Sequence, residues 1–163
     1  MGKRPLRLLV VLGSGGHTKE MLRLVDLLGP GYEYSYLVCA DDELSARKIR
    51  MPGAVHRMIR PRLLNTGVLT NGLRTLWGAG QAFVALWQTR PRAIISAGPG
   101  IAVPACVLAK CLGIKVIYIE TGSRVFALSM SGKILRHFAD LFFVQWEELL
   151  SLYPKAIYAG RLL

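Results

Sequence analysis

A glycine-rich turn near the start of the chain holds the first residues whose types and spacing could do chemistry. The segment Gly13-Ser14-Gly15-Gly16-His17-Thr18 follows an apolar run and precedes a helical pattern. Glycines let the backbone approach a ligand closely, and a helix start offers free N–H groups and a positive dipole end. The turn therefore suits a phosphate or diphosphate, although a tight strand–helix turn without a ligand has the same composition. His17 is either a general base near neutral pH or an exposed residue without a role.

The same turn argues against two classes of nucleotide-binding protein. A dinucleotide fingerprint of the form G-x-G-x-x-G would have its third glycine where this chain has Thr18, which weakens that interpretation. The chain contains no Gly-Lys-Ser or Gly-Lys-Thr, so a triphosphate-binding loop is excluded.

Two later segments also place glycine or polar residues directly after an apolar strand. The turn Ser96-Ala97-Gly98-Pro99-Gly100 is either a sugar or phosphate contact or a turn whose dihedral angles need Gly and Pro. Glu120 can act as a base or accept sugar hydroxyls, and its alternative is an ion pair with Arg124 or another basic residue. Lys133 and Arg136, on the next predicted helix, either hold anionic ligand groups or face solvent.

Positive charge is concentrated in the middle of the chain. Of the 21 Lys and Arg residues, eleven lie between residues 44 and 119, where Asp and Glu are absent. An apolar helix with interfacial Trp and flanking Arg is typical of a helix lying on an anionic membrane, and a core helix with solvated ends is the alternative. The predicted membrane-contacting residues are Arg60, Arg62, Arg74, Trp77 and Trp87. No nucleic-acid-binding module is recognisable, so nucleic acid is not an expected partner.

Composition bounds the class of protein. The 163 residues suffice for a single domain, 1–163, and 52% of them are hydrophobic, which excludes disorder as the main state. Three cysteines without metal-ligand spacing exclude a disulfide framework, and we expect neither a metal nor a cofactor.

The best candidate for a membrane span, 75–87, has 13 residues, whereas a span needs about 20. With no evident signal peptide, the sequence predicts a peripheral protein at the cytoplasmic face of a membrane.

Apolar runs alternate with helical patterns along the whole chain. We predict strands at 6–12, 32–39, 54–59, 92–96, 115–119, 141–144 and 156–158. Helices are predicted at 17–28, 66–89, 101–112, 131–138 and 146–152, with a further short one ending near residue 50. This alternation favours an α/β fold, namely a Rossmann-like open parallel sheet. Ligands bind such sheets at the carboxyl ends of the strands, so the three turns described above are expected to converge on one edge.

Several motifs, taken together, resemble a known family. They are GSGGHT with Glu20 shortly after it, SAGPGIAVPAC, YIETGSR with LSMSGKIL, VQW and YPKAIYAGR. These motifs are similar to the acceptor-side subunit of the two-subunit N-acetylglucosaminyltransferase of dolichol-linked oligosaccharide assembly, the asparagine-linked glycosylation subunit fourteen (Alg14-like) family. The match runs from Leu6 to Arg161, and its part from Ser129 onward is specific. Bacterial relatives act in exopolysaccharide synthesis with undecaprenyl carriers, and the N-terminal half of the MurG lipid-linked glycosyltransferases is more distantly similar.

The resemblance implies a division of labour between two subunits. It implies the fold of the N-terminal half of a GT-B glycosyltransferase. This chain would associate with an anionic membrane surface and bind a sugar acceptor carried on a polyprenyl or dolichyl diphosphate. A second small subunit would bind the UDP-sugar, with N-acetylglucosamine, glucose and glucuronate all open as the sugar, and would dock near Ile157–Leu163. The reaction would invert the anomeric centre, and this chain alone would be inactive.

The resemblance also implies roles for individual residues. His17 or Glu120 would be the base that deprotonates the acceptor hydroxyl. The acceptor diphosphate and sugar would be bound by Gly13, Ser14, Gly15, Gly16, Thr18, Gly98, Gly100, Arg124 and Lys133. Eukaryotic members carry an N-terminal membrane helix, whereas here only Met1–Pro5 precede the first predicted strand. We therefore expect a prokaryotic member, held at the membrane by its partner, by residues 60–87 or by both. Two rival functions stay open: a membrane recruiter with no residue in the chemistry, and a nucleotide-cofactor-binding protein.

Overall fold

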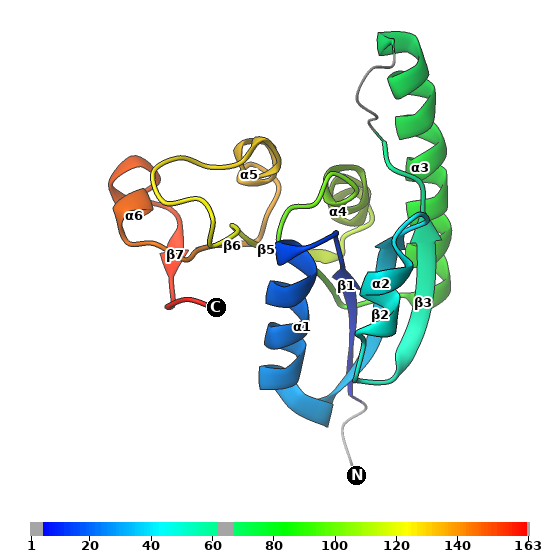
Figure 1. Cartoon of the computed structure of the whole chain (residues 1–163), viewed down its shortest axis with the longest axis horizontal. Coiled ribbons are helices and arrows are strands. Elements are labelled where there is room, and N and C mark those ends of the chain that lie inside the picture. Colours follow the sequence, from blue (N-terminus) through cyan, green and yellow to red (C-terminus); the bar gives the residue numbers. More distant parts are fainter. Residues whose placement is uncertain (1–4, 62–66, 163) are drawn as a thin grey trace.

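The computed structural model describes residues 5–61 and 67–162 (Figure 1). Its strands are β1 (Leu6–Val11), β2 (Tyr32–Cys39), β3 (Gly53–Met58), β4 (Ala93–Ser96), β5 (Lys115–Ile119), β6 (Leu141–Val144) and β7 (Ile157–Tyr158). Its α-helices are α1 (Gly16–Leu28), α2 (Glu43–Arg47), α3 (Val68–Thr89), α4 (Ala102–Cys111), α5 (Met130–Leu135) and α6 (Glu148–Leu152), and the short 3₁₀ helix η1 (Gly29–Gly31) follows α1. The predicted order of strands and helices is confirmed, with α2 and α5 ending about three residues earlier than expected.

The described strands form one parallel sheet in the order β3-β2-β1-β4-β5-β6-β7. The chain builds outward from β1 to β3, returns through α3 to β4 on the other side of β1, and then builds outward to β7 (Figure 1). The direction therefore reverses between β1 and β4, and open α/β sheets bind ligands at such a point. The predicted Rossmann-like open parallel sheet is confirmed.

The central strand β1 shows why a continuous apolar run forms a buried strand. Leu9 and Val11 pack in the core that includes residues of α3 and α4, whereas Leu8 and Val10 pack in the core that includes residues of α1. Helices thus cover both faces of the sheet. A strand buried on both faces is apolar throughout, whereas alternating polar and apolar residues are typical of a strand with one face in solvent. Each such side chain contributes about 1.5–3 kcal/mol when fully buried.

The long helix α3 contacts the sheet with only one of its sides. That side carries small residues, among them Gly78, Ala82 and Ala85, which are buried. A Cβ atom on Gly78 would lie 2.8 Å from Cε of Met58, so the glycine permits close contact with β3. The first turns of α3 project past the carboxyl ends of the strands, on the side where the turns after β1 and β4 lie (Figure 1).

Candidate functional site

The turns after β1, β4 and β5 lie at one edge of the sheet because these three strands are neighbours. The turns after β1 and β4 touch: a Cβ on Gly13 would lie 2.5 Å from Cβ of Pro99. Gly98 has a φ of +90°, and the Tyr118 hydroxyl occupies the space that a Cβ there would need. Close packing therefore requires Gly13, and the left-handed backbone together with packing requires Gly98, whatever ligand the turns hold.

The threonine of the first turn supports the turn from inside. The Thr18 hydroxyl donates a hydrogen bond to the Gly13 carbonyl, and the Ser45 hydroxyl bonds to the same carbonyl at 3.0 Å. Asp42, which caps α2, accepts hydrogen bonds from the backbone N–H and the hydroxyl of Ser45. Thr18 was expected to contact the ligand, but its side chain is only 1% exposed and lines neither cavity of the site.

Two cavities open on either side of this turn and share Ser14 and His17 as lining residues. The Arg60 cavity, of about 270 Å³, is lined by Gly13, Ser14, His17, Cys39, Arg60, Pro61 and Gly98–Ile101. The Glu20 cavity, of about 500 Å³, is lined by Ser14, Gly16, His17, Glu20, Thr121–Ser123, Trp146 and Arg161. The predicted convergence of the three turns is thus confirmed, with His17 standing between the cavities.

Arg60 lies in this site, although its sequence context suggested a membrane contact. Its Nε donates hydrogen bonds to both carboxylate oxygens of Asp41, at 3.1 and 2.8 Å. These bonds raise the pKa of Arg60 above its usual value, so the residue is a permanent positive charge. β3 ends at Met58, and its parallel pairing with β2 carries the following residues to the same edge as the glycine turns.

Glu120 is turned into the protein and lines neither cavity. It is fully buried: one carboxylate oxygen accepts from the N–H of Thr121 at 3.0 Å, and the other accepts from the N–H and hydroxyl of Ser129 at 3.0 and 3.1 Å. Burial raises its pKa above the usual value, although these hydrogen bonds and the charge of Arg124 oppose the shift. Among the described residues it forms no salt bridge with Arg124. Glu120 instead anchors Ser129, whose side chain caps α5.

The two remaining basic candidates lie outside both cavities. Arg124 and Lys133 are exposed, the first in the turn after β5 and the second on α5. Glu20 appears among the family motifs, but its sequence context assigned it no place in the site; it lies on α1 one turn after His17 and is 2% exposed. A signal was present, because a His and a Glu three positions apart on a helix share one face.

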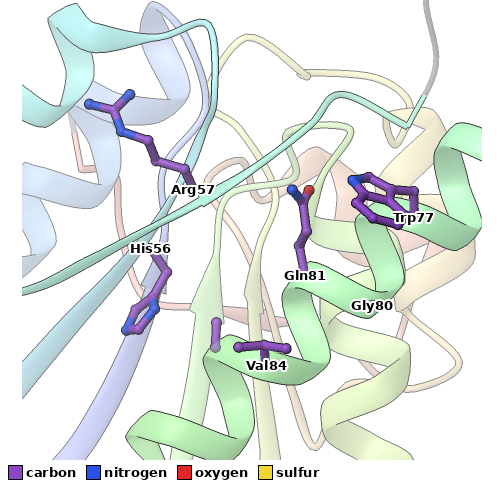
Figure 2. A pocket seen from close by; sticks show the side chains of 7 residues that line it. His56, Arg57, Trp77, Gly80, Gln81 and Val84 are labelled. Carbon is purple, nitrogen blue, oxygen red and sulfur yellow. The ribbon is translucent and has the colours of Figure 1, made fainter.

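The outward side of α3 is apolar and exposed. Val68, Trp77 and Trp87 are 92%, 68% and 64% exposed, and Leu69, Leu73 and Leu76 lie on the same exposed stretch. A cavity of about 430 Å³ between β3 and α3 is lined by His56, Arg57, Trp77, Gly80, Gln81, Val84 and Ala85 (Figure 2). The alternative of a core helix is thus correct for only one side of α3.

The arginines predicted to accompany this helix lie in different surroundings. Nε of Arg74 donates to the carbonyl of Arg60 at 3.2 Å, which ties α3 to the segment after β3. Arg90 places its guanidinium 5.6 Å from the centre of the Trp87 ring. Arg62 lies outside the described residues. Among the described helices, none combines the length and hydropathy that crossing a bilayer requires.

Solved structures confirm the fold class. MurG from Acinetobacter baumannii superposes with a TM-score of 0.72 at 18% identity, over 88% of this chain and 43% of that one. A UDP-N-acetylglucosamine 2-epimerase from Rickettsia bellii gives a TM-score of 0.72 at 15% identity, over 98% of this chain and 46% of that one. This chain thus spans less than half of each of these similar structures, and the likeness establishes the fold alone.

Sequence relatives match nearly the whole chain. The UDP-N-acetylglucosamine transferase subunits ALG14 of Homo sapiens and Mus musculus are 39% and 38% identical, each over 98% of this chain and 84% of the relative. The corresponding subunit of Schizosaccharomyces pombe is 37% identical over 97% of this chain. The family model described as oligosaccharide biosynthesis protein Alg14 like matches residues 8–162. The resemblance found in the motifs is therefore confirmed, and the chain belongs to the Alg14 family of oligosaccharide biosynthesis proteins.

Proposed function

We propose that this chain is the acceptor-binding and membrane-associating subunit of a heteromeric UDP-sugar glycosyltransferase. The complex would transfer N-acetylglucosamine, the sugar named in its ALG14 relatives, to a sugar carried on a polyprenyl or dolichyl diphosphate. The observation that carries the proposal is the glycine turn after β1, which stands between the Arg60 cavity and the Glu20 cavity. A diphosphate-linked sugar has one anionic end and one hydroxyl-rich end. The anionic end matches the Arg60 cavity, and the hydroxyl-rich end matches the Glu20 cavity.

The diphosphate would occupy the Arg60 cavity. Gly13 and Ser14 line this space, and Gly15 and Gly16 follow them at the N-terminus of the 13-residue helix α1, which would offer the ligand free N–H groups and a positive dipole end. The Arg60 guanidinium adds a permanent charge that pairs well with phosphate oxygens. Gly98 and Gly100, from the turn after β4, line the same cavity.

His17 is proposed as the base because it is a titratable residue that lines both cavities. The acceptor hydroxyl would lose its proton to His17 while its oxygen attacks the anomeric carbon of the UDP-sugar. The bond from that carbon to the β-phosphate oxygen breaks, UDP leaves with the electron pair, and the configuration inverts. Glu120 is proposed to support the turn after β5, since both its oxygens already accept hydrogen bonds from the protein.

The UDP-sugar would be bound by a second small subunit that closes over the carboxyl edge of the sheet. The names of the ALG14 relatives, which are subunits, support this partner. The C-terminal segment 157–163 is the proposed docking region, because β7 is the last strand of the described sheet and its outer edge is not paired there. Ile157 and Tyr158 are each 38% exposed, so their side chains are accessible to a partner.

Membrane association is assigned to α3. Its exposed apolar side chains lie within a stretch, residues 44–119, that contains no acidic residue. Apolar insertion and attraction to anionic lipids therefore act together. The proposed contacts are Arg74, Trp77 and Trp87, with Arg62 included on its sequence alone. Because α3 follows Arg60 closely in the chain, a lipid-linked diphosphate would leave the membrane beside its cavity.

The proposal is tested by producing the chain with and without a candidate second subunit, namely a small α/β protein that binds UDP-sugars. Purified samples are assayed with UDP-N-acetylglucosamine, UDP-glucose and UDP-glucuronate, each with a short-chain lipid diphosphate that carries one sugar. We expect transfer only when both proteins are present, with N-acetylglucosamine preferred as donor. Undiminished turnover by this chain alone would remove the two-subunit claim, and no turnover by the pair with any donor would remove the transferase claim.

A non-catalytic membrane recruiter is the second candidate, and the apolar side of α3 is the observation that favours it. In that case the pair would still be active, but His17 variants would leave turnover at saturating acceptor unchanged. A nucleotide-cofactor protein is less well supported, because buried Thr18 occupies the third glycine position of the fingerprint.

A further inference from the structure

Glu20 presents two carboxylate oxygens with different surroundings. Oε1 accepts hydrogen bonds from the Gly122 N–H at 2.6 Å, the Gln145 Nε2 at 3.1 Å and the Thr121 hydroxyl at 3.2 Å. Oε2 is buried and has no partner among the described residues. The side chain as a whole is 2% exposed and lines the Glu20 cavity.

The bonds to Oε1 are a clamp that ties α1 to the turn after β5 and to the residue that follows β6. This clamp uses one oxygen, so a neutral amide carbonyl in the same place would serve it equally well. A buried polar atom left without a partner costs about 1–3 kcal/mol. The structural role of Glu20 therefore accounts for Oε1 and leaves the buried oxygen Oε2 unexplained.

We infer that Glu20 Oε2 accepts a hydrogen bond from a hydroxyl of the acceptor sugar, which makes Glu20 a specificity-determining residue. The inference rests on the proposed acceptor-binding function. A carboxylate oxygen can only accept, and it repels phosphate, so it selects the hydroxyl-rich end of the acceptor. Ser14, Ser123 and the Trp146 indole line the same cavity, which thus offers hydroxyls and an aromatic ring to a sugar.

The position of His17 agrees with this assignment. His17 lies one turn before Glu20, lines the same cavity, and its Nδ1 is also buried without a partner in the described part of the chain. A sugar held by Glu20 would therefore lie beside the proposed base. Arg161 also lines the cavity, and its guanidinium lies over the Trp146 ring, 4.7 Å from the ring centre.

The test uses Glu20→Gln in the two-subunit complex. The glutamine carbonyl can keep the three donors of the clamp, whereas its NH₂ group places a donor where Oε2 was an acceptor. Acceptors are a lipid diphosphate bearing one N-acetylglucosamine and a set of analogues that each lack one hydroxyl of that sugar. We expect the wild-type complex to lose about 10- to 100-fold in kcat/KM on one of these analogues. E20Q should lose less than about threefold on that same analogue, because the partner of the missing hydroxyl is already gone.

Two controls separate recognition from scaffolding. Gln145→Met removes one donor of the clamp but leaves Oε2, so it should lower thermal stability and keep the wild-type discrimination between acceptors. Glu33→Gln makes the same charge change at an exposed position on β2. It should keep both the thermal stability and the discrimination between acceptors. If the E20Q complex does not assemble, Glu20→Asp carries the comparison, since it keeps the charge but withdraws the carboxylate by one methylene.

The outcomes are distinguishable from a failure of the proposed function. A wild-type complex that transfers sugar to no lipid diphosphate would overturn the acceptor-binding function, and the inference with it. If the wild-type complex is active and the E20Q complex discriminates between the acceptors as the wild type does, the role of Glu20 in recognition is overturned, and the acceptor-binding function stands. Equal loss of activity by E20Q on every acceptor would likewise assign Glu20 to the clamp only.

Discussion

His17 stands where the two cavities meet, so its chemistry can be separated from the packing around it. The substitution His17→Ala removes the proposed base but leaves the glycine turn, which Thr18 and Ser45 hold from inside. We expect kcat of the two-subunit complex to fall by about 10²–10⁴-fold with little change in the acceptor KM. His137, which is exposed and lies two residues after the end of α5, provides the matched control as His137→Ala. An unchanged kcat for H17A would exclude the base and favour the recruiter.

Gly98 and Gly100 belong to the same turn but face different surroundings. A Cβ on Gly98 would meet the Tyr118 hydroxyl, and the backbone there has a φ of +90°. No heavy atom lies within 4 Å of the place of a Cβ on Gly100, whose φ is ordinary. We expect Gly98→Ala to lower the free energy of unfolding by at least about 2 kcal/mol, through strain and overlap together. Gly100→Ala should change it by less than about 0.5 kcal/mol. Urea unfolding followed by circular dichroism measures both, and equal stabilities would contradict the argument.

At the scale of elements, α3 combines a side that packs and a side that does not. Leu69 and Leu73 are 79% and 61% exposed, so replacing both by Gln should leave the fold intact. If these leucines insert into a bilayer, the double variant loses apolar burial worth about 2–4 kcal/mol, and binding to anionic vesicles should weaken at least about tenfold. Leu27→Gln, a leucine of α1 that is 61% exposed, is the control and should bind as the wild type does. Vesicle sedimentation measures the binding, and unchanged binding of the double variant would remove α3 from the membrane surface.

The elements could be predicted from sequence because their signals are local. The run 6–12 indicates a strand buried on both faces, and the pattern 66–89 indicates an amphipathic helix, without knowledge of any partner. The residues that sequence reasoning did not assign to the site depend on distant partners instead. Glu20 meets Thr121, Gly122 and Gln145, which follow it by 101, 102 and 125 positions. Arg60 reaches its cavity only because β3 pairs with β2, and a count of charges along the chain cannot show that pairing.

At the scale of the whole molecule, the order of the strands explains why the site and α3 lie together. The crossover from β3 to β4 passes through α3, and the same crossover creates the reversal between β1 and β4 where the cavities lie. One connection thus builds the crevice proposed for the diphosphate and carries the apolar helix to the same end of the sheet (Figure 1). The proposed lipid-linked acceptor would need both features side by side.

Stability of the whole chain should depend on pH through Asp140, which joins three segments. Its Oδ1 pairs with the Nζ atoms of Lys110 and Lys115 at 2.9 and 3.0 Å, and its Oδ2 accepts from the Val116 N–H at 2.9 Å. The Val116 hydrogen bond, together with the two lysines, holds the pKa of Asp140 well below its usual range. The unfolded chain therefore binds this proton at a higher pH than the folded chain does. The stabilisation is fully present above the ordinary aspartate pKa of about 3.9 and is lost as pH falls below it.

The substitution Asp140→Asn measures this contribution. Because the lysine side chains are 42% and 63% exposed, solvent screens the ion pairs, and we expect a loss of about 1–2 kcal/mol at pH 7. The difference between wild type and D140N should shrink steadily as pH falls below about 4, since protonation of Asp140 then stabilises the unfolded wild-type chain more than the folded one. Asp26→Asn is the control, because Asp26 pairs at 3.4 Å with an arginine that is 81% exposed and should contribute less than about 0.5 kcal/mol. A difference that is the same at neutral and acidic pH would mean that Asp140 stabilises the fold through its shape and neutral hydrogen bonds, and not through its charge.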